Sequence, residues 1–477
     1  MKINIQKNSY LIMLGIIAFG SIIRIYNINF NDFWSDEIVS YFISDPKLSF
    51  ENSVKLIFQS NLMLTFELIL KYFHNLFGYD FYISRYLPAI FNISSLLLFY
   101  IFIKKNNNKE SALLGVTLLT INIYHIKYAI ELRSYSLTFL LVLVILNLIF
   151  TKSKIKNEFN LINYILIFIT SVCMLFSHAY SIILLISLNS FILLIFVKKK
   201  FIQKELLILF FIFSFSLIFF LFFYLSNISH YPSWIPELKK SFYTNYFFST
   251  FFGSRLIGII HLLILIYLII KFFKDTYKSF NLQFFLILFL FFSYFIPISY
   301  GYIFSPALID RYIFFVIIPI LYSLSTLTIS INIKKLKIFL IIILIIPSFL
   351  NHFTENTFKQ FYTQIYPSKP EIKKTLLNIK NSENTTYSII QVENNPYNIN
   401  FAYENYFKNY SRNINNKFYY IDYTDSSILP NKFWLIYLTD ITNKKFQLPN
   451  NLKNYQVSDI KIFNHIESYL LKKNETK

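Results

Sequence analysis

Long apolar runs alternate with short polar segments from the N-terminus to about residue 350. A helix needs roughly 20 mostly apolar residues to cross a bilayer, with a range of about 17–25. Measured against that length, the pattern predicts about eleven transmembrane helices, so we expect residues 1–350 to form an all-α membrane domain. The predicted spans are residues 9–26, 84–103, 111–125, 134–150, 161–178, 180–197, 205–226, 256–272, 281–299, 312–331 and 337–350.

The pattern changes after the last predicted span. Residues 351–477 are rich in Asn, Lys, Tyr and Ser, and residues 369–381 carry apolar side chains at helical spacing. Short runs of β-branched and aromatic residues, bounded by Asn, Asp or Pro, predict strands at 387–392, 417–421 and 432–438. We therefore expect a small α/β domain over residues 351–477.

Lysine-rich segments follow every second predicted span, and they indicate how the chain is oriented. By the positive-inside rule, short loops with many lysines face the cytoplasm. The N-terminus is then cytoplasmic, whereas the long first loop (27–83) and the C-terminal domain are extracytoplasmic, as in a multi-pass protein of the plasma or inner membrane. The lysine-rich segments are residues 104–109, 152–156, 198–204, 271–278 and 334–337.

The composition agrees with a membrane protein. Hydrophobic residues make up 55% of the 477 residues, charged residues only 15%, and the mean hydropathy is +0.49. The net charge of +20 lies largely in the loops, so it indicates membrane topology rather than nucleic-acid binding. The single cysteine excludes an intrachain disulfide framework, and no zinc or iron–sulfur ligand set is present. With only seven glycines and no glycine-rich phosphate loop, a soluble type of nucleotide-sugar site is not expected.

The loops predicted to face outward hold the unusual polar residues. A purely structural membrane protein has no need to gather acids and bases on one face, whereas an enzyme working at the outer surface does. Ionisable groups near lipid are costly unless they are solvated or functional. The candidates are Asp36, Glu37, Glu131, Arg133, His178 and Arg311.

Five segments along the membrane region carry a resemblance to a known class. The sequence resembles polytopic glycosyltransferases of the GT-C class, which take a sugar from a polyprenyl-phosphate donor. Its relatives include protein O-mannosyltransferases, aminoarabinose transferases and lipopolysaccharide galacturonosyltransferases. The resemblance covers roughly residues 1–350. The segments are residues 34–37 (WSDE), 76–78 (LFG) with 84–91 (SRYLPAIF), 128–135 (YAIELRSY), 177–180 (SHAY) and 310–314 (DRYIF).

The resemblance implies a membrane glycosyltransferase that moves a sugar to a glycolipid, glycan or protein of the cell envelope, with inversion. Such a transfer needs a base for the acceptor and positive charge for the departing lipid phosphate. The resemblance assigns the base to Asp36, with Glu37 as an accessory carboxylate. Arg311 and Arg133 are then the candidates for binding the donor phosphate, because guanidinium groups pair bidentately with phosphate oxygens.

Three further residues are expected near the acceptor or in support of the site: Glu131, His178 and Asn61. Asn61 opens a segment, residues 61–66, where many relatives have a Lys or His followed by two prolines. Arg85 is interpreted as an anchor of the second span at the headgroups. The resemblance implies no cofactor and no metal, although paired carboxylates can hold Mg²⁺ or Mn²⁺.

Other interpretations of these residues stay open. Asp36 and Glu37 can cap a helix that begins near Ser35, because carboxylates favour helix N-termini. Glu131 and Arg133 can form an interfacial ion pair. The alternative functions are a transporter or flippase, or a polymerase, of lipid-linked saccharides. A transporter predicts ionisable residues midway along the spans and repeated halves, and neither is found in the sequence.

Overall fold

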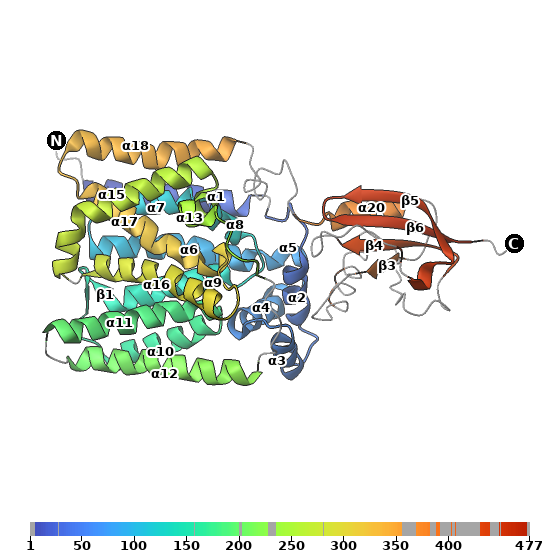
Figure 1. Cartoon of the computed structure of the whole chain (residues 1–477), viewed down its shortest axis with the longest axis horizontal. Coiled ribbons are helices and arrows are strands. Elements are labelled where there is room, and N and C mark those ends of the chain that lie inside the picture. The colour runs from blue at the N-terminus through green and yellow to red at the C-terminus, as the bar shows by residue number, and fades with distance from the viewer. Residues whose placement is uncertain are drawn as a thin grey trace.

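The computed structural model of the chain consists of a large helical bundle and a small sheet that lies beyond one end of the bundle (Figure 1). Four short helices of the first loop lie between these two parts (Figure 1). The structure describes residues 5–26, 28–156, 158–199, 203–227, 235–279, 281–354, 369–381, 388–391, 402, 406, 430–438, 448 and 450–474.

Helices occupy the places where spans are predicted. Among the described residues, seven helices are long and apolar enough to cross a membrane, and three shorter apolar helices accompany them. The bundle helices are α1 (Ile5–Ile25), α6 (Tyr86–Asn106), α7 (Lys109–Thr120), α8 (Ile123–Ala129), α9 (Tyr135–Ile149), α10 (Leu161–Leu175), α11 (Ile182–Lys199), α12 (Lys204–Asn227), α15 (Arg255–Ser279), α16 (Leu282–Ile303), α17 (Ile317–Ile329) and α18 (Lys334–Leu350).

The span predicted at 111–125 is interrupted by a break between two helices. Helix α7 ends at Thr120, and α8 starts after Asn122, whose side chain caps α8 by accepting a hydrogen bond from the His125 N–H at 2.8 Å. The buried guanidinium of Arg24 donates to the carbonyls of Leu119 and Thr120, each at 3.2 Å. Because these side chains replace the missing helical hydrogen bonds, the chain can break inside the bundle.

The first loop is largely helical. It contains α2 (Ser35–Ile43), α3 (Phe50–Gln59), α4 (Leu64–Phe77) and α5 (Phe81–Ser84). The start of α2 at Ser35 agrees with the interpretation of the acidic pair as part of a helix N-terminus. The remaining short elements are the hairpin β1 (Phe150–Thr151) and β2 (Lys154–Ile155), η1 (Ala179–Ser181), α13 (Phe242–Asn245), α14 (Phe248–Phe252), η2 (Asp310–Val316) and η3 (Asn351–Phe353).

Among the described residues, the C-terminal part contains a four-stranded sheet in the order β3-β4-β6-β5, in which the β3–β4 pair is parallel and the β4–β6 and β5–β6 pairs are antiparallel. The predicted helix and two of the predicted strands are confirmed here, whereas the strand expected at 417–421 lies outside the described residues. The elements are α20 (Ile372–Asn381), β3 (Ser388–Gln391), β4 (Lys432–Leu438), η5 (Asn450–Leu452), β5 (Tyr455–Phe463) and β6 (Ile466–Lys473).

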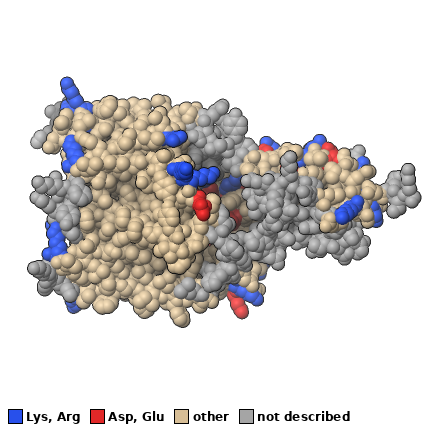
Figure 2. Space-filling view, in the orientation of Figure 1, with Lys and Arg blue, Asp and Glu red and all other residues tan. Residues whose placement is uncertain are grey.

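Charged side chains lie mainly at the two ends of the bundle (Figure 2). Lys and Arg gather at the end far from the sheet, and acidic and basic residues meet where the bundle adjoins the sheet (Figure 2). Contacts place several lysine-rich segments at the far end: Lys104 donates to Tyr10 of α1, and the Lys152 N–H donates to the Lys105 carbonyl. The side of the bundle between these ends is nearly free of charge in this view.

Candidate functional site

The site is built around the first turn of α2, where the acidic pair lies. Trp34 is the N-cap residue, and its backbone N–H donates a hydrogen bond to the Glu37 carboxylate at 3.3 Å. Glu37 therefore turns inward and caps the helix, whereas the preceding Asp36 side chain is 39% exposed. Adjacent carboxylates thus face different surroundings, because neighbouring residues on a helix point in different directions.

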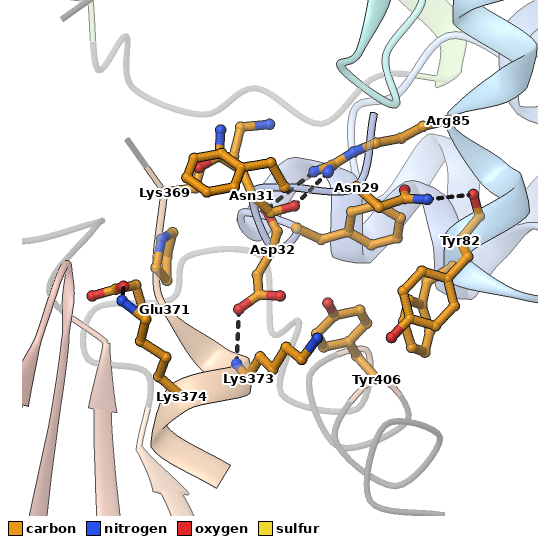
Figure 3. A pocket seen from close by; sticks show the side chains of 14 residues that line it. Asn29, Asn31, Asp32, Tyr82, Arg85, Lys369, Glu371, Lys373, Lys374 and Tyr406 are labelled. Carbon is orange, nitrogen blue, oxygen red and sulfur yellow. Dashed lines mark hydrogen bonds and ion pairs between the residues drawn. The ribbon is translucent and has the colours of Figure 1, made fainter. Parts of the chain in front are cut away.

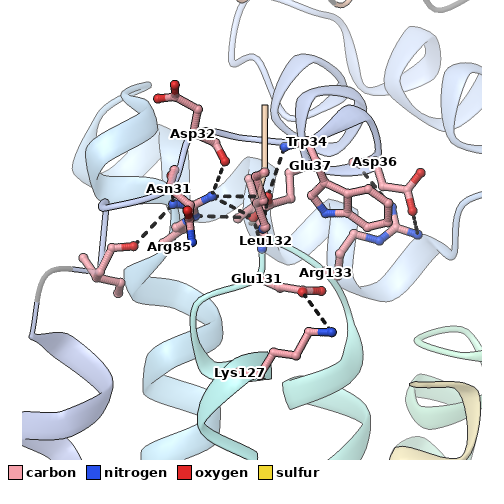
Figure 4. A network of polar contacts seen from close by, with 12 residues as sticks. Asn31, Asp32, Trp34, Asp36, Glu37, Arg85, Lys127, Glu131, Leu132 and Arg133 are labelled. Atoms are coloured by element: carbon pink, nitrogen blue, oxygen red, sulfur yellow. Dashed lines mark hydrogen bonds and ion pairs between the residues drawn. The ribbon is translucent and has the colours of Figure 1, made fainter. Parts of the chain in front are cut away.

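Glu37 has no exposed surface and joins three segments of the helical part (Figure 4). Arg85, at the start of α6, approaches it with Nη2 at 3.2 Å from Oε2 and Nε at 3.3 Å from Oε1. The Leu132 N–H, between α8 and α9, donates to Oε1 at 2.8 Å. Burial opposes the charge of Glu37, but Arg85 and Lys369 hold the pKa of this carboxyl below its ordinary value.

The sequence suggested that Arg85 anchors a span at the headgroups, but the structure gives this side chain a different place. It is only 1% exposed, and besides Glu37 it binds the carbonyls of Ile28, Asn31 and Asp32. Its guanidinium therefore fixes the segment that leads into α2. The sequence concealed this role because an arginine at the end of an apolar run is usually an interfacial one.

Arg133 is the basic partner of Asp36. Its Nη2 lies 3.9 Å from Asp36 Oδ2, and its Nη1 lies 3.4 Å from both the Asp36 carbonyl and Ser40 Oγ. The Nε of Arg133 is buried and makes no hydrogen bond to the residues that the structure describes. The side chain is 17% exposed, so one edge of this guanidinium can reach a ligand.

Arg311 approaches the same turn from η2. Its guanidinium carbon lies 5.4 Å from the centre of the Trp34 ring, within the range of a cation–π contact. Asp36 attracts both Arg311 and Arg133 electrostatically. Three segments that are far apart in the sequence thus bring one carboxylate and two guanidinium groups together.

His178 lies beside these arginines at the start of η1. Its ring is 5.6 Å from that of Tyr135, 5.8 Å from that of Tyr180 and 5.3 Å from that of Tyr312, measured between centroids. Burial, together with the positive charges of Arg133 and Arg311, lowers the pKa of the imidazole to about 3. His178 is therefore neutral at physiological pH, and its Nδ1 accepts a hydrogen bond from the Tyr180 N–H at 3.3 Å.

The two remaining predicted residues lie at the margin of this arrangement. Glu131 is buried and forms an ion pair with Lys127 at 4.0 Å, one helical turn earlier, rather than with Arg133. Asn61 follows α3 in a left-handed conformation with a φ of 52°. Its Oδ1 is buried and has no hydrogen-bond partner among the described residues.

The sequence reasoning missed Glu67, a buried acid of α4. Ser40 Oγ donates to its Oε1 at 2.9 Å, and the same Ser40 oxygen is 3.4 Å from Arg133. Glu67 is 3% exposed, and burial raises its pKa to about 7, although Arg133 opposes that shift. Its one signal in the sequence is a lone carboxylate within the apolar run at residues 62–70.

No group of three or more His, Cys, Asp or Glu side chains among the described residues is arranged to hold a metal ion. The groups that meet at the site are instead one half-exposed carboxylate, two guanidinium groups and a neutral imidazole. This set can accept a proton and bind an anion at neighbouring positions.

The fold of the chain is similar to those of two solved proteins, ArnT and an archaeal oligosaccharyltransferase. The chain is similar over its whole length to ArnT from Cupriavidus metallidurans, with a TM-score of 0.57, 9% identity and 98% of each chain covered in the apo state. For the same protein bound to undecaprenyl phosphate, the TM-score is 0.53 at 8% identity, with 97% of each chain covered.

A second similar structure is the oligosaccharyltransferase of Archaeoglobus fulgidus in its apo form, with a TM-score of 0.53 and 10% identity. The match covers 84% of this chain but only 63% of the oligosaccharyltransferase, so this chain spans less than two thirds of the length of the oligosaccharyltransferase. No protein family profile matches the chain. No curated protein sequence matches it either.

Proposed function

We propose that the protein is a membrane glycosyltransferase that moves a sugar from a polyprenyl-phosphate donor to a hydroxyl or amine of a cell-envelope acceptor. The observation that carries this proposal is the meeting of Asp36, Arg133 and Arg311 at one end of the bundle. The fold supports it, because ArnT has been solved with undecaprenyl phosphate. The acceptor is a glycolipid, a glycan or a protein.

In the proposed reaction, the acceptor attacks the anomeric carbon of the sugar from the side opposite the phosphate. The new glycosidic bond forms as the bond between the anomeric carbon and the phosphate oxygen breaks, so the configuration inverts. Asp36 takes the proton of the acceptor, because its carboxylate is exposed enough to meet a substrate and to return the proton to water. The departing lipid phosphate takes the bonding electrons.

Arg133 and Arg311 are proposed to bind that phosphate and to stabilise its growing negative charge. Both arginines are half-buried, so their positive charges are less screened than those of surface residues. His178 is neutral beside them, so it adds no positive charge to the phosphate site. Glu37, which is fully enclosed, is proposed to hold the turn that carries Asp36 rather than to contact a substrate.

We further propose that the site faces the extracytoplasmic side. The lysine-rich loops and the site lie at opposite ends of the bundle, which supports this orientation under the positive-inside rule (Figure 2). Residues 351–477 would then form an extracytoplasmic α/β domain next to the site. The long first loop would lie between that domain and the membrane.

The test compares the sugars on envelope glycolipids, glycans and proteins of cells that lack the gene with those of cells that express the wild type, Asp36→Asn or Glu51→Gln. Glu51 is an exposed acid of the same loop and serves as the control. We expect the deletion to remove one sugar from an envelope glycan, lipid or protein, and we expect E51Q but not D36N to restore it. Full restoration by D36N at equal expression would refute Asp36 as the base. Movement of a lipid-linked sugar without a new glycosidic bond would indicate a flippase.

A further inference from the structure

The C-terminal part of the chain reaches the centre of the site through one lysine. Lys369 lies shortly before α20, and its Nζ is 2.5 Å from Glu37 Oε2. Both side chains are buried, with 7% of Lys369 and none of Glu37 exposed. Figure 3 shows Lys369 and Arg85 beside each other, although they come from opposite parts of the molecule. Glu37 is thus held by two cations, of which only Arg85 belongs to the bundle.

A second polar contact joins the same two parts. Asp32, four residues before Asp36, accepts a hydrogen bond at Oδ2 from the backbone N–H of Lys373 at 2.7 Å. Lys373 is in the first turn of α20, where a carboxylate is favoured by the unpaired N–H groups and the helix dipole. A pocket of about 210 Å³, lined by both segments, lies around this contact (Figure 3).

Apolar residues close the rest of the junction. Phe33 and Phe81 of the first loop share one buried cluster with Ile372, Leu376 and Trp434 of the C-terminal part. Ile372, Leu376 and Trp434 are fully buried. The sheet and α20 are therefore packed onto the first loop as parts of a common core, and burial of this apolar surface stabilises their position.

The charges at the junction are balanced by neighbours from both parts. Glu37 accepts from Lys369, Arg85 and the Leu132 N–H, and Glu131 lies near enough to attract Lys369. Removing one member of a buried ion pair leaves its partner's charge poorly compensated. Without Lys369, Glu37 would keep its bonds to the bundle but lose its connection to the C-terminal part.

We propose that Lys369 is a positioning residue for sugar transfer, an inference that rests on the function proposed above. Glu37 is adjacent in sequence to Asp36, and the N–H that it binds at Leu132 is adjacent to Arg133. Lys369 therefore acts, through one carboxylate, on the two segments that carry the base and a phosphate-binding arginine. The C-terminal part completes the active site without contacting the substrate.

The experiment measures transfer and unfolding for the full-length, detergent-solubilised protein with Lys369→Met, Lys369→Arg and Lys373→Met. Lys373 is the matched control, because its side chain is exposed and its contact with Asp32 uses the backbone, which the substitution keeps. We expect K369M to lower kcat by about tenfold to a hundredfold with little change in KM for the polyprenyl-phosphate sugar, since misplacement of reacting groups acts on the chemical step. K369R should restore much of kcat, and K373M should match the wild type.

A second measurement is independent of activity. The double variant Glu37→Gln with Lys369→Met removes both charges of the pair. Its unfolding temperature should therefore fall by less than the sum of the decreases in the two single variants. A wild type without transfer activity but with this coupling would refute the proposed function and keep Lys369 as a structural contact. Wild-type kcat in K369M, or an equal loss in K373M, would overturn the positioning role. If K369M does not fold, K369R and the double variant decide the same question: additive unfolding effects would overturn the inference.

Discussion

Glu67 offers a test of the site's electrostatics that needs no substrate. This acid of α4 is 3% exposed, and its Oε1 accepts a hydrogen bond from Ser40 at 2.9 Å. Burial raises its pKa from 4.5 to about 7, while Arg133 favours the charged form and Asp36 disfavours it. Glu67→Gln keeps the shape of the side chain and an oxygen that can accept the hydrogen bond from Ser40, but it cannot ionise.

The sign of the effect follows from the raised pKa. Between the unfolded pKa of 4.5 and the folded pKa of about 7, the folded protein keeps a proton that the unfolded chain releases. The stabilisation from Glu67 is therefore fully present below pH 4.5 and is lost as the pH rises through about 7. At 1.4 kcal/mol for each pKa unit, this loss amounts to about 3 kcal/mol.

The assay follows thermal unfolding of the detergent-solubilised wild type, Glu67→Gln and the exposed control Glu51→Gln between about pH 5 and pH 8. A thiol-reactive dye can report unfolding, because Cys173 is the only cysteine of the chain and is half-buried. We expect the wild type and E51Q to lose stability toward pH 8 more steeply than E67Q. An infrared band of a protonated carboxyl group should also be absent from E67Q. Equal pH slopes and an unchanged infrared spectrum would refute the assignment of a protonated Glu67.

Three further predictions concern other parts of the molecule. Arg311→Lys should lower kcat for sugar transfer by about tenfold or more, since an ammonium cannot pair bidentately with phosphate; unchanged kinetics would exclude Arg311 from the phosphate site. Gly258→Ala should cost about 1–3 kcal/mol of stability, because an added Cβ would lie 2.5 Å from the backbone of Phe248. Gly15→Ala, where a Cβ meets nothing within 4 Å, should be neutral, and equal unfolding temperatures for the two variants would contradict this reasoning. A periplasmic-type reporter fused after Lys477 should be active, whereas activity of a cytoplasmic reporter there would reverse the proposed orientation.

The bundle was largely predictable because lipid-spanning helices need long apolar runs, and the sequence displays these runs directly. The position of the break between α7 and α8 could not be predicted from local sequence alone, because Arg24, almost a hundred residues earlier, satisfies the carbonyls at the end of α7. Among the helices of the first loop, only the start of α2 near Ser35 was anticipated, whereas α3, α4 and α5 escaped prediction. Their pattern mixes polar and apolar residues, and their packing depends on the C-terminal part.

The candidate site likewise contains some residues that the sequence identified and others whose contacts only the structure shows. Asp36, Arg133 and Arg311 were identified from their segments, and the structure brings them together. The roles of Arg85, Lys369 and Glu67 emerged only from the folded structure. Each of these side chains is buried by residues distant in sequence, and local sequence carries no record of such neighbours.

The sequence by itself determined the membrane-spanning character, the approximate places of the helices and the two ends to which charged residues are confined, because all three follow from hydropathy along a linear chain. Only the tertiary structure decided what the neighbouring acids do: Asp36 faces outward beside Arg133, whereas Glu37 is enclosed between Arg85 and Lys369. The physical reason is that burial and ion pairing depend on groups that folding brings within a few ångströms. For Glu37 and Lys369, those groups are 332 residues apart in the chain.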